Sequence, residues 1–190
     1  MGGLRDLILN TEKSIENRFN YYSDKIAKKM AGPEPDLDPA HILEQLNKNE
    51  LLQSENFKSG KTSISFDTSG VNPPADKRDP ALIIIQRALV ALGLLKVDRT
   101  KKYWWTRKDA FPYKIDDGRI TWGEYGQKTT KAVAELQDLS GINLDKGKRG
   151  AWFGRDTLPV LKVALDAMVK KQDWRKVVKD YNYKQHNIKQ

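Results

Sequence analysis

The sequence predicts a mainly helical protein. Apolar residues recur three, four or seven positions apart in residues 3–31, 80–92, 126–137 and 153–165, and this spacing gathers them on one face of a helix. Proline or glycine stands near the ends of these stretches, where such residues begin or end helices. Strand-like alternation is confined to a short piece, residues 62–66, within a polar segment.

Residues 3–31 are predicted to form one amphipathic helix. Charged and polar residues occupy its other faces, so the apolar stripe must pack on a partner, either the rest of this chain or another subunit. The Gly-Pro-Glu-Pro segment at 32–35 ends the helix, because proline lacks an amide hydrogen and restricts the backbone. The expected partner-binding residues are Leu4, Ile8, Ile15, Phe19, Tyr22 and Ile26.

A second helix is predicted to begin with Asp38 as N-cap and Pro39 at the first helical position, and to run through Leu51. We therefore assign residues 1–53 to a helical attachment region. Residues 54–79 are rich in Ser, Gly, Lys, Asp and Pro, and they are expected to form an extended linker. This linker is a plain tether or, as the alternative, adds an edge strand to another element.

Three helices are expected in the next segment, residues 80–170. The first spans about 80–92, and Gly93 supplies a left-handed exit from its end. The second and third helices follow Gly126 and Gly154. Both begin with the same short motif, Gly-x-x-Thr-x-x followed by two apolar residues, so the sequence contains an internal repeat.

These phrases resemble the peptidoglycan-binding domain family of bacterial cell-wall proteins. Its members carry Leu-Gln-x-x-Leu-x-x-Leu-Gly, then Asp-Gly-x-Phe-Gly-x-x-Thr-x-x-Ala-Val-x-x-Phe-Gln, then a closing Gly-x-x-Thr-Leu. The resemblance covers about residues 80–166 and implies a three-helix module that binds peptidoglycan. The matching residues are Gln86, Leu89, Leu92, Gly93, Asp117, Gly118, Gly126, Thr129, Ala132, Val133, Gln137, Gly154, Thr157 and Leu158, with Leu136 where the family has phenylalanine.

Most of the matching residues have an architectural explanation: glycines at helix ends, apolar residues in the core and threonines as helix caps. The chain departs from the family in two insertions. Residues 96–116 separate the first helix from the Asp-Gly turn, and a second insertion separates that turn from Gly126. A fold can persist while its binding site changes, so the resemblance implies the fold more directly than the ligand.

Aromatic and basic residues crowd the long insertion and recur near the two repeated glycines. They are compatible with four roles, in decreasing order of expectation: enlarging the core, forming a protein interface, stacking on an acidic glycan, and binding single-stranded nucleic acid. The candidate residues for binding a glycan or a partner are Tyr103, Trp104, Trp105, Arg107, Tyr113, Arg119, Trp122, Tyr125 and Trp152.

We expect no catalysis, cofactor or metal. The chain has no cysteine, and His41 and His186 stand far apart, which argues against a nucleophile–histidine triad and a thiolate metal site. Carboxylates at Asp116, Asp117 and Glu124 could in principle hydrolyse a glycoside. The Asp-Asp-Gly run is more simply a turn, and a small three-helix module offers little room for a cleft.

Net charge is +9 with an isoelectric point near 9.5, which attracts polyanions of any chemistry. Because acidic residues are interspersed, we expect an ordinary solvated surface and not a nucleic-acid site. The basic segment 171–190 is predicted to form a short C-terminal helix or tail, with Trp174, Val177, Val178 and Tyr181 at amphipathic spacing.

No apolar run is long enough for a transmembrane helix, and the first residues lack a secretory signal pattern. We therefore expect synthesis in the cytoplasm, followed by action at the cell envelope or within a released particle. The expected function is non-catalytic binding or targeting to peptidoglycan or another acidic glycan, with a protein partner on the N-terminal helix. The alternative is a structural adaptor subunit of a bacterial or phage tail-like contractile injection assembly, with the module making protein–protein contacts.

Overall fold

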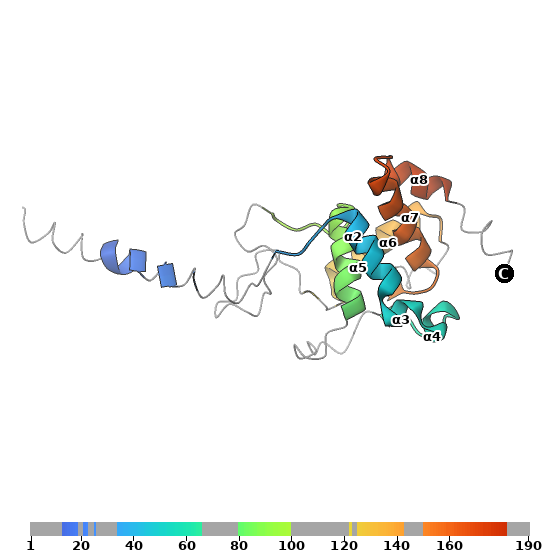
Figure 1. The fold of residues 1–190 in the computed structure, drawn as a ribbon, viewed down its shortest axis with the longest axis horizontal. Coiled ribbons are helices and arrows are strands. Elements are labelled where there is room, and N and C mark those ends of the chain that lie inside the picture. The colour runs from blue at the N-terminus through green and yellow to red at the C-terminus, as the bar shows by residue number, and fades with distance from the viewer. Residues whose placement is uncertain are drawn as a thin grey trace, which may run out of the picture. The chain divides into compact units, whose positions relative to one another are not determined.

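The computed structural model describes residues 13–18, 21–22, 25, 34–65, 80–99, 122, 125–142 and 150–181. The chain divides into two compact units: residues 1–34 with 98–119, and residues 35–97 with 120–190. We call the second unit the helical module, and its elements are labelled in Figure 1. The predicted mainly helical class is confirmed.

The elements follow one another in a simple order, with short helices and two short strands between the longer helices. In the first unit, the described residues 13–18, 21–22 and 25 are helical. The helical module contains α2 (Pro39–Lys48), α3 (Glu50–Gln53), α4 (Glu55–Lys58), β1 (Ile64–Ser65), α5 (Pro80–Ala91), α6 (Gln127–Leu139), β2 (Trp152–Phe153), α7 (Thr157–Val169) and α8 (Trp174–Asp180).

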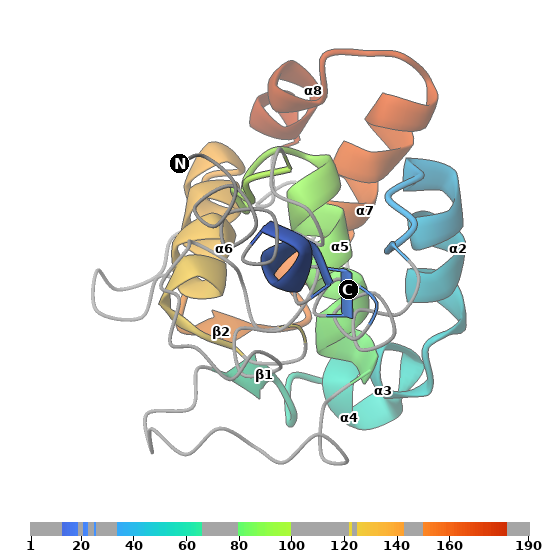
Figure 2. The same ribbon diagram turned by 90° about the vertical axis from the view of Figure 1, so that its left-hand side faces the viewer.

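Four helices surround the core of the helical module. Helix α2 contacts α5 and α7, and α6 contacts the same two helices. Figure 2 shows α2 and α6 on opposite sides of α5. Burial follows the apolar spacing of each helix. The fully buried core side chains include Ile42 and Leu46 of α2, Ile85 and Leu89 of α5, Val133 and Leu136 of α6, and Leu161 and Leu165 of α7.

The participation of α2 differs from the predicted domain organisation, which placed residues 1–53 in an attachment region apart from the module. Ile42 and Leu46 lie one helical turn apart, and both are fully buried against α5 and α7. Apolar spacing identified the buried face of this helix. It did not identify the helices that cover the face, because spacing carries no information about the partner.

The start of α2 was predicted correctly, and its end was not. Asp38 is the N-cap and accepts a hydrogen bond of 2.8 Å from the amide of Ala40, with Pro39 in the first turn. The helix ends at Lys48, because Asn49 adopts extended backbone and its side chain accepts from the amide of Leu52 at 3.1 Å. Asn49 therefore ends α2 and caps α3, which splits the predicted single helix.

The predicted linker 54–79 contains regular structure in its described part, residues 54–65. Helix α4 forms there because the Ser54 hydroxyl accepts from the amide of Phe57 at 3.2 Å, and the Phe57 ring is buried. Strand β1 then pairs antiparallel with β2, with Ile64 opposite Phe153. The edge-strand alternative is therefore the one observed in this part, while residues 66–79 lie outside the described residues.

Glycines end both α5 and α6 through one motif, as predicted for Gly93. Gly93 has φ +73°, and the amide of Leu94 donates to the carbonyl of Leu89 at 2.9 Å. Gly141 has φ +69°, and the amide of Ile142 donates back into α6 at 3.1 Å. Both ends are Schellman motifs, in which a left-handed residue lets the chain reverse and satisfies the last carbonyls.

Helix α7 ends in the same motif with a non-glycine residue. Lys171 has φ +56°, and the amide of Gln172 donates to the carbonyl of Ala167 at 2.8 Å. Helix α8 then begins at the cap Asp173 and buries Val178, so the predicted amphipathic spacing after residue 173 is confirmed as a separate helix.

An exposed cluster joins the segment before α2 to α5. Arg87 donates to the carbonyl of Asp36 at 2.7 Å and to the Gln45 side chain at 2.7 Å. The Asp36 carboxylate lies 2.8 Å from His41 Nδ1 and also accepts from the Asp38 amide at 2.8 Å. Hydrogen bonds from Asp38 and then His41 lower the pKa of Asp36, and the bond to Asp36 raises the pKa of His41.

Replacing Lys171 by glycine should stabilise the protein. The left-handed backbone costs an L-residue about 1–2 kcal/mol, and glycine avoids that cost at the price of a more flexible unfolded chain, so Lys171→Gly should gain about 0.5–1 kcal/mol. Urea unfolding followed by circular dichroism measures the change. Lys170→Gly, one residue earlier at φ −81°, is the control and should lose stability. Equal effects of the two changes would contradict the role of φ.

The Asp36–His41 pair should stabilise the module most in mild acid. A raised His41 pKa gives stability below its unfolded value, and a lowered Asp36 pKa gives stability above its unfolded value, so both act between about pH 4 and 6.5. His41→Asn should therefore lower the urea midpoint more at pH 5.5 than at pH 8. Asp166→Asn removes an exposed pair with Lys170 on α7, away from His41, and should show the same loss at both pH values.

Candidate functional site

Two buried glutamine–threonine hydrogen bonds join the three helices that carry the repeated phrases. Gln86 of α5 donates to the Thr129 hydroxyl of α6 at 3.1 Å, and Gln137 of α6 donates to the Thr157 hydroxyl of α7 at 3.0 Å. All four side chains are buried. A buried amide needs partners, so each glutamine fixes the start of the following helix relative to its own helix. We call these contacts the Gln–Thr joints.

The Gln–Thr joints correct the predicted role of the threonines. The sequence predicted that the matched threonines, such as Thr129, act as helix caps. Instead, Thr129 accepts from Gln86, and the Thr130 hydroxyl donates to the carbonyl of Gly126 at 3.1 Å. Gly126 itself is the N-cap and makes no side-chain cap hydrogen bond. For Thr129 the prediction failed because its partner, Gln86, lies on another helix.

Gln137 also holds the segment that leads into β2. Its Oε1 accepts from the amide of Gly150 at 2.8 Å, and its Nε2 donates to the carbonyl of Trp152 at 3.0 Å. The Tyr125 hydroxyl donates to the carbonyl of Gly150 at 2.8 Å. Burial raises the pKa of the Tyr125 hydroxyl, which keeps this donor protonated. Two buried side chains therefore fix the backbone of residues 150–152.

Only glycine suits position 150 in this packing. Gly150 has φ +70°, and a Cβ atom there would lie 2.0 Å from the carbonyl oxygen of Thr130. That backbone oxygen belongs to α6 and cannot turn aside as a flexible side chain would. The turn before β2 is thus pressed against the first turns of α6, which limits its freedom to move.

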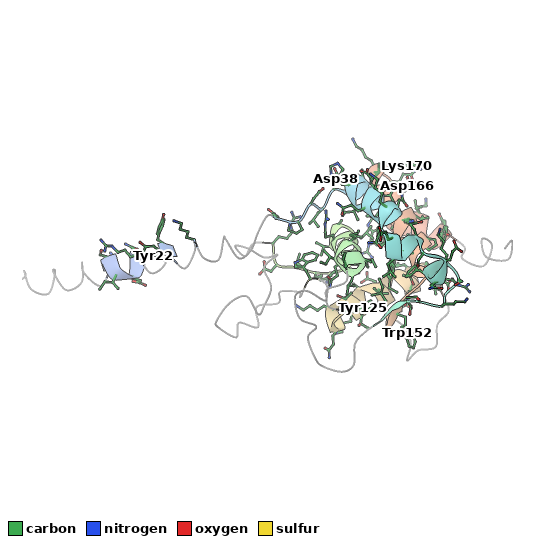
Figure 3. All side chains as sticks on the ribbon, turned by 60° about the horizontal axis from the view of Figure 1, so that its bottom comes forward. Tyr22, Asp38, Tyr125, Trp152, Asp166 and Lys170 are labelled. Atoms are coloured by element: carbon green, nitrogen blue, oxygen red, sulfur yellow. The ribbon has the colours of Figure 1, made fainter. Side chains whose placement is uncertain are left out.

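The fixed backbone of residues 150–152 carries one exposed aromatic residue, Trp152. Its side chain is 42% exposed, while its neighbour Phe153 is fully buried, as expected for alternate faces of a strand. Figure 3 labels Trp152 at the periphery of the helical module. Arg155 follows, with half its side chain exposed, and donates to the carbonyl of Ser59 at 3.2 Å. We call Trp152 and Arg155 the Trp152 surface.

The two other described residues from the predicted aromatic site lie inside the module. Trp122 is 8% exposed and Tyr125 is 4% exposed, so neither ring offers a face to a ligand in this conformation. For these two residues the first of the four roles holds, since they enlarge the core. The remaining predicted site residues lie outside the described residues: Tyr103, Trp104, Trp105, Arg107, Tyr113 and Arg119.

On the N-terminal helix, the described partner-binding residues are exposed. Ile15 is 63% exposed and Tyr22 is 61% exposed. Tyr21, which the apolar spacing did not select, packs edge-on against Tyr22 with ring centroids 5.6 Å apart. The predicted residues Leu4, Ile8, Phe19 and Ile26 lie outside the described residues.

Sequence reasoning also missed Arg155. Its neighbours were assigned to a helix start, and the nearby carbonyl of Ser59 belongs to a segment 96 residues earlier. The only sequence signal is its position three residues after Trp152. Charge and aromatic character close together would have justified including it among the candidates.

Among the residues described, no group of three or more His, Asp and Glu side chains is placed to hold a metal ion. An open hollow of about 570 Å³ lies on α6 and α8, and Glu135 on its edge pairs with Arg175 at 3.1 Å. Across the same described ranges, no helix is both long and apolar enough to cross a bilayer.

Comparison of the chain with protein-family models, curated proteins and solved structures finds no match.

Replacing Gly150 by alanine should be far more costly than the same change at Gly141. Both residues have positive φ, which costs alanine about 1–2 kcal/mol. A Cβ at Gly141 meets open space, whereas one at Gly150 strikes the Thr130 carbonyl, so Gly150→Ala should lose at least about 2 kcal/mol more. Urea unfolding of both variants measures the difference. Equal losses would mean that the turn at 150 is not held against α6.

Proposed function

We propose that this chain is a non-catalytic protein that binds or targets peptidoglycan through its helical module, in the manner of the three-helix family that its sequence resembles. The main support for this proposal is that residues of the matched phrases form the Gln–Thr joints of one compact unit. Phrases spread over about 80 residues act together in a single fold, which supports a common origin with that family over a chance match.

The Trp152 surface is the described part of the proposed binding face. A flat aromatic ring stacks on the C–H face of a sugar, and a guanidinium pairs with the carboxylates of peptide stems. The backbone of Trp152 is held by Gln137 and by strand pairing, so no backbone has to be ordered there on binding. Trp104 and Trp105 of the aromatic insertion are further proposed binding residues, and they lie outside the described residues.

A second candidate function is a structural adaptor in a bacterial or phage tail-like assembly. The favouring observation is the exposure of Ile15 and Tyr22 on a helix outside the module. Exposed apolar residues aligned on a helix are typical of a surface that is covered by another protein. The two functions are compatible in a particle whose module reaches the wall.

Sedimentation with purified insoluble peptidoglycan tests wall binding. Wild type should be retained, and Trp152→Ala should weaken binding about tenfold, as expected for the loss of one aromatic stack of about 1.4 kcal/mol. Trp174→Ala on α8 is the matched control and should bind as wild type does. Trp104→Ala/Trp105→Ala tests the contribution of the insertion.

The salt dependence separates recognition from simple charge attraction. A basic protein adheres to anionic polymers at low salt, and that attraction is screened as salt rises. Retention should therefore persist at 0.5 M NaCl. Absence of wild-type retention at that salt would reject wall binding, while equal retention of wild type and Trp152→Ala would reject the Trp152 surface as its site.

A further inference from the structure

Neither the backbone nor the packing of the module requires glycine at position 154. Gly154 is not among the described glycines with positive φ, so other residues can adopt its backbone conformation. Apart from its chain neighbours, a Cβ atom at Gly154 would meet one atom within 4 Å, the Cβ of Ser63 at 3.8 Å, which is an ordinary van der Waals contact. Ser63 is itself exposed. The missing side chain therefore leaves open surface at this point of the module.

The open surface at Gly154 lies between the two side chains of the Trp152 surface. Trp152 projects from β2 and is 42% exposed (Figure 3). Arg155 follows three residues later, and three residue steps span at most about 11 Å. A ligand little longer than one sugar ring can therefore reach both side chains, and a side chain at position 154 would stand between them.

The Arg155 side chain is held in place at its end of this surface. It lies across Gly60, where a Cβ atom would come within 3.3 Å of Arg155 Cδ and Nε. Arg155 Nη1 donates to the carbonyl of Ser59 at 3.2 Å, and Nε lies 3.4 Å from Oδ1 of Asp156. These contacts leave further N–H donors of the guanidinium for an anion, and they reduce the side-chain freedom that binding would remove.

We infer that Trp152, Gly154 and Arg155 form a single subsite for a sugar ring together with the acidic peptide stem attached to that ring. This subsite rests on the proposed function, which supplies peptidoglycan as the ligand. The sugar stacks its C–H face on Trp152 and crosses Gly154, and a stem carboxylate accepts hydrogen bonds from Arg155. A glycan strand without stems contacts only the Trp152 end, and a free stem contacts only the Arg155 end.

Calorimetric titration of the full chain with soluble fragments tests the subsite. The probes are a disaccharide that carries an acidic tripeptide stem, the same fragment with its stem carboxylates amidated, and a neutral chitin oligosaccharide. Wild type should bind the acidic fragment about tenfold more tightly than the other two, because only that fragment offers a carboxylate to Arg155. Equal affinity for the acidic and amidated fragments would overturn the inference.

Changes at Arg155 and Asp156 should shift this preference in opposite directions. Arg155→Gln removes the charge that pairs with the stem, so the acidic and amidated fragments should bind equally. Asp156→Asn removes a negative charge beside the guanidinium, so the acidic fragment should bind more tightly and the amidated fragment should not. Asp156 makes no side-chain cap hydrogen bond to α7, so the change removes no cap. A proportional change in the affinity for both fragments would contradict the assigned role of Arg155.

Gly154→Leu tests the open surface between the two side chains. Because a Cβ atom is tolerated at this position, the variant should keep the urea midpoint of wild type. The leucine side chain would stand between Trp152 and Arg155 and should weaken binding of the acidic fragment by about tenfold or more. Gln172→Leu, an exposed position beyond the other end of α7, is the matched control. Undiminished binding by the folded Gly154→Leu variant would overturn the subsite.

Retention on insoluble peptidoglycan separates failure of the subsite from failure of the proposed function. Wild type that is retained on the wall without preferring the acidic fragment binds through other residues, which would overturn the subsite alone. Wild type that is not retained and binds none of the fragments would overturn both.

Discussion

The side-chain amide of Gln137 connects separate parts of the helical module. It bonds Gly150 and Trp152 on both sides of the turn before β2, and it bonds Thr157 at the start of α7. Each of these groups is polar and lies in or beside the core, so loss of the amide would leave several of them unsatisfied. An unsatisfied buried polar group costs about 1–3 kcal/mol, which makes this one side chain critical for the geometry of the module.

The rigidity that Gln137 confers extends to the surface through β2. Phe153 faces the core and Trp152 faces outward, so the fixed strand backbone determines where the exposed ring projects. Strand β1 completes the support from residues almost ninety positions earlier in the chain. The module thus presents an exposed aromatic residue on a fixed backbone, and in the first unit Ile15 and Tyr22 are exposed.

The matched phrases acquire a physical meaning from the Gln–Thr joints. Gln86 and Gln137 occupy different helices, yet each donates to a threonine near the start of the next helix. Each copy of the internal repeat therefore supplies a threonine that joins two helices through a buried hydrogen bond. Such hydrogen bonds determine the fold and not the ligand that the fold binds.

Local chemistry made several features predictable from the sequence. Glycine at 93 and 141 ends α5 and α6 because only glycine adopts positive φ without strain, and Asp38 with Pro39 begins α2 because their side chains act on the adjacent backbone. Features that need distant residues were not predictable: the helices that cover α2, and the pairing of β1 with β2. Periodicity tells which face of an element is apolar. Tertiary packing decides what covers that face, because burial depends on contacts between segments far apart in the chain.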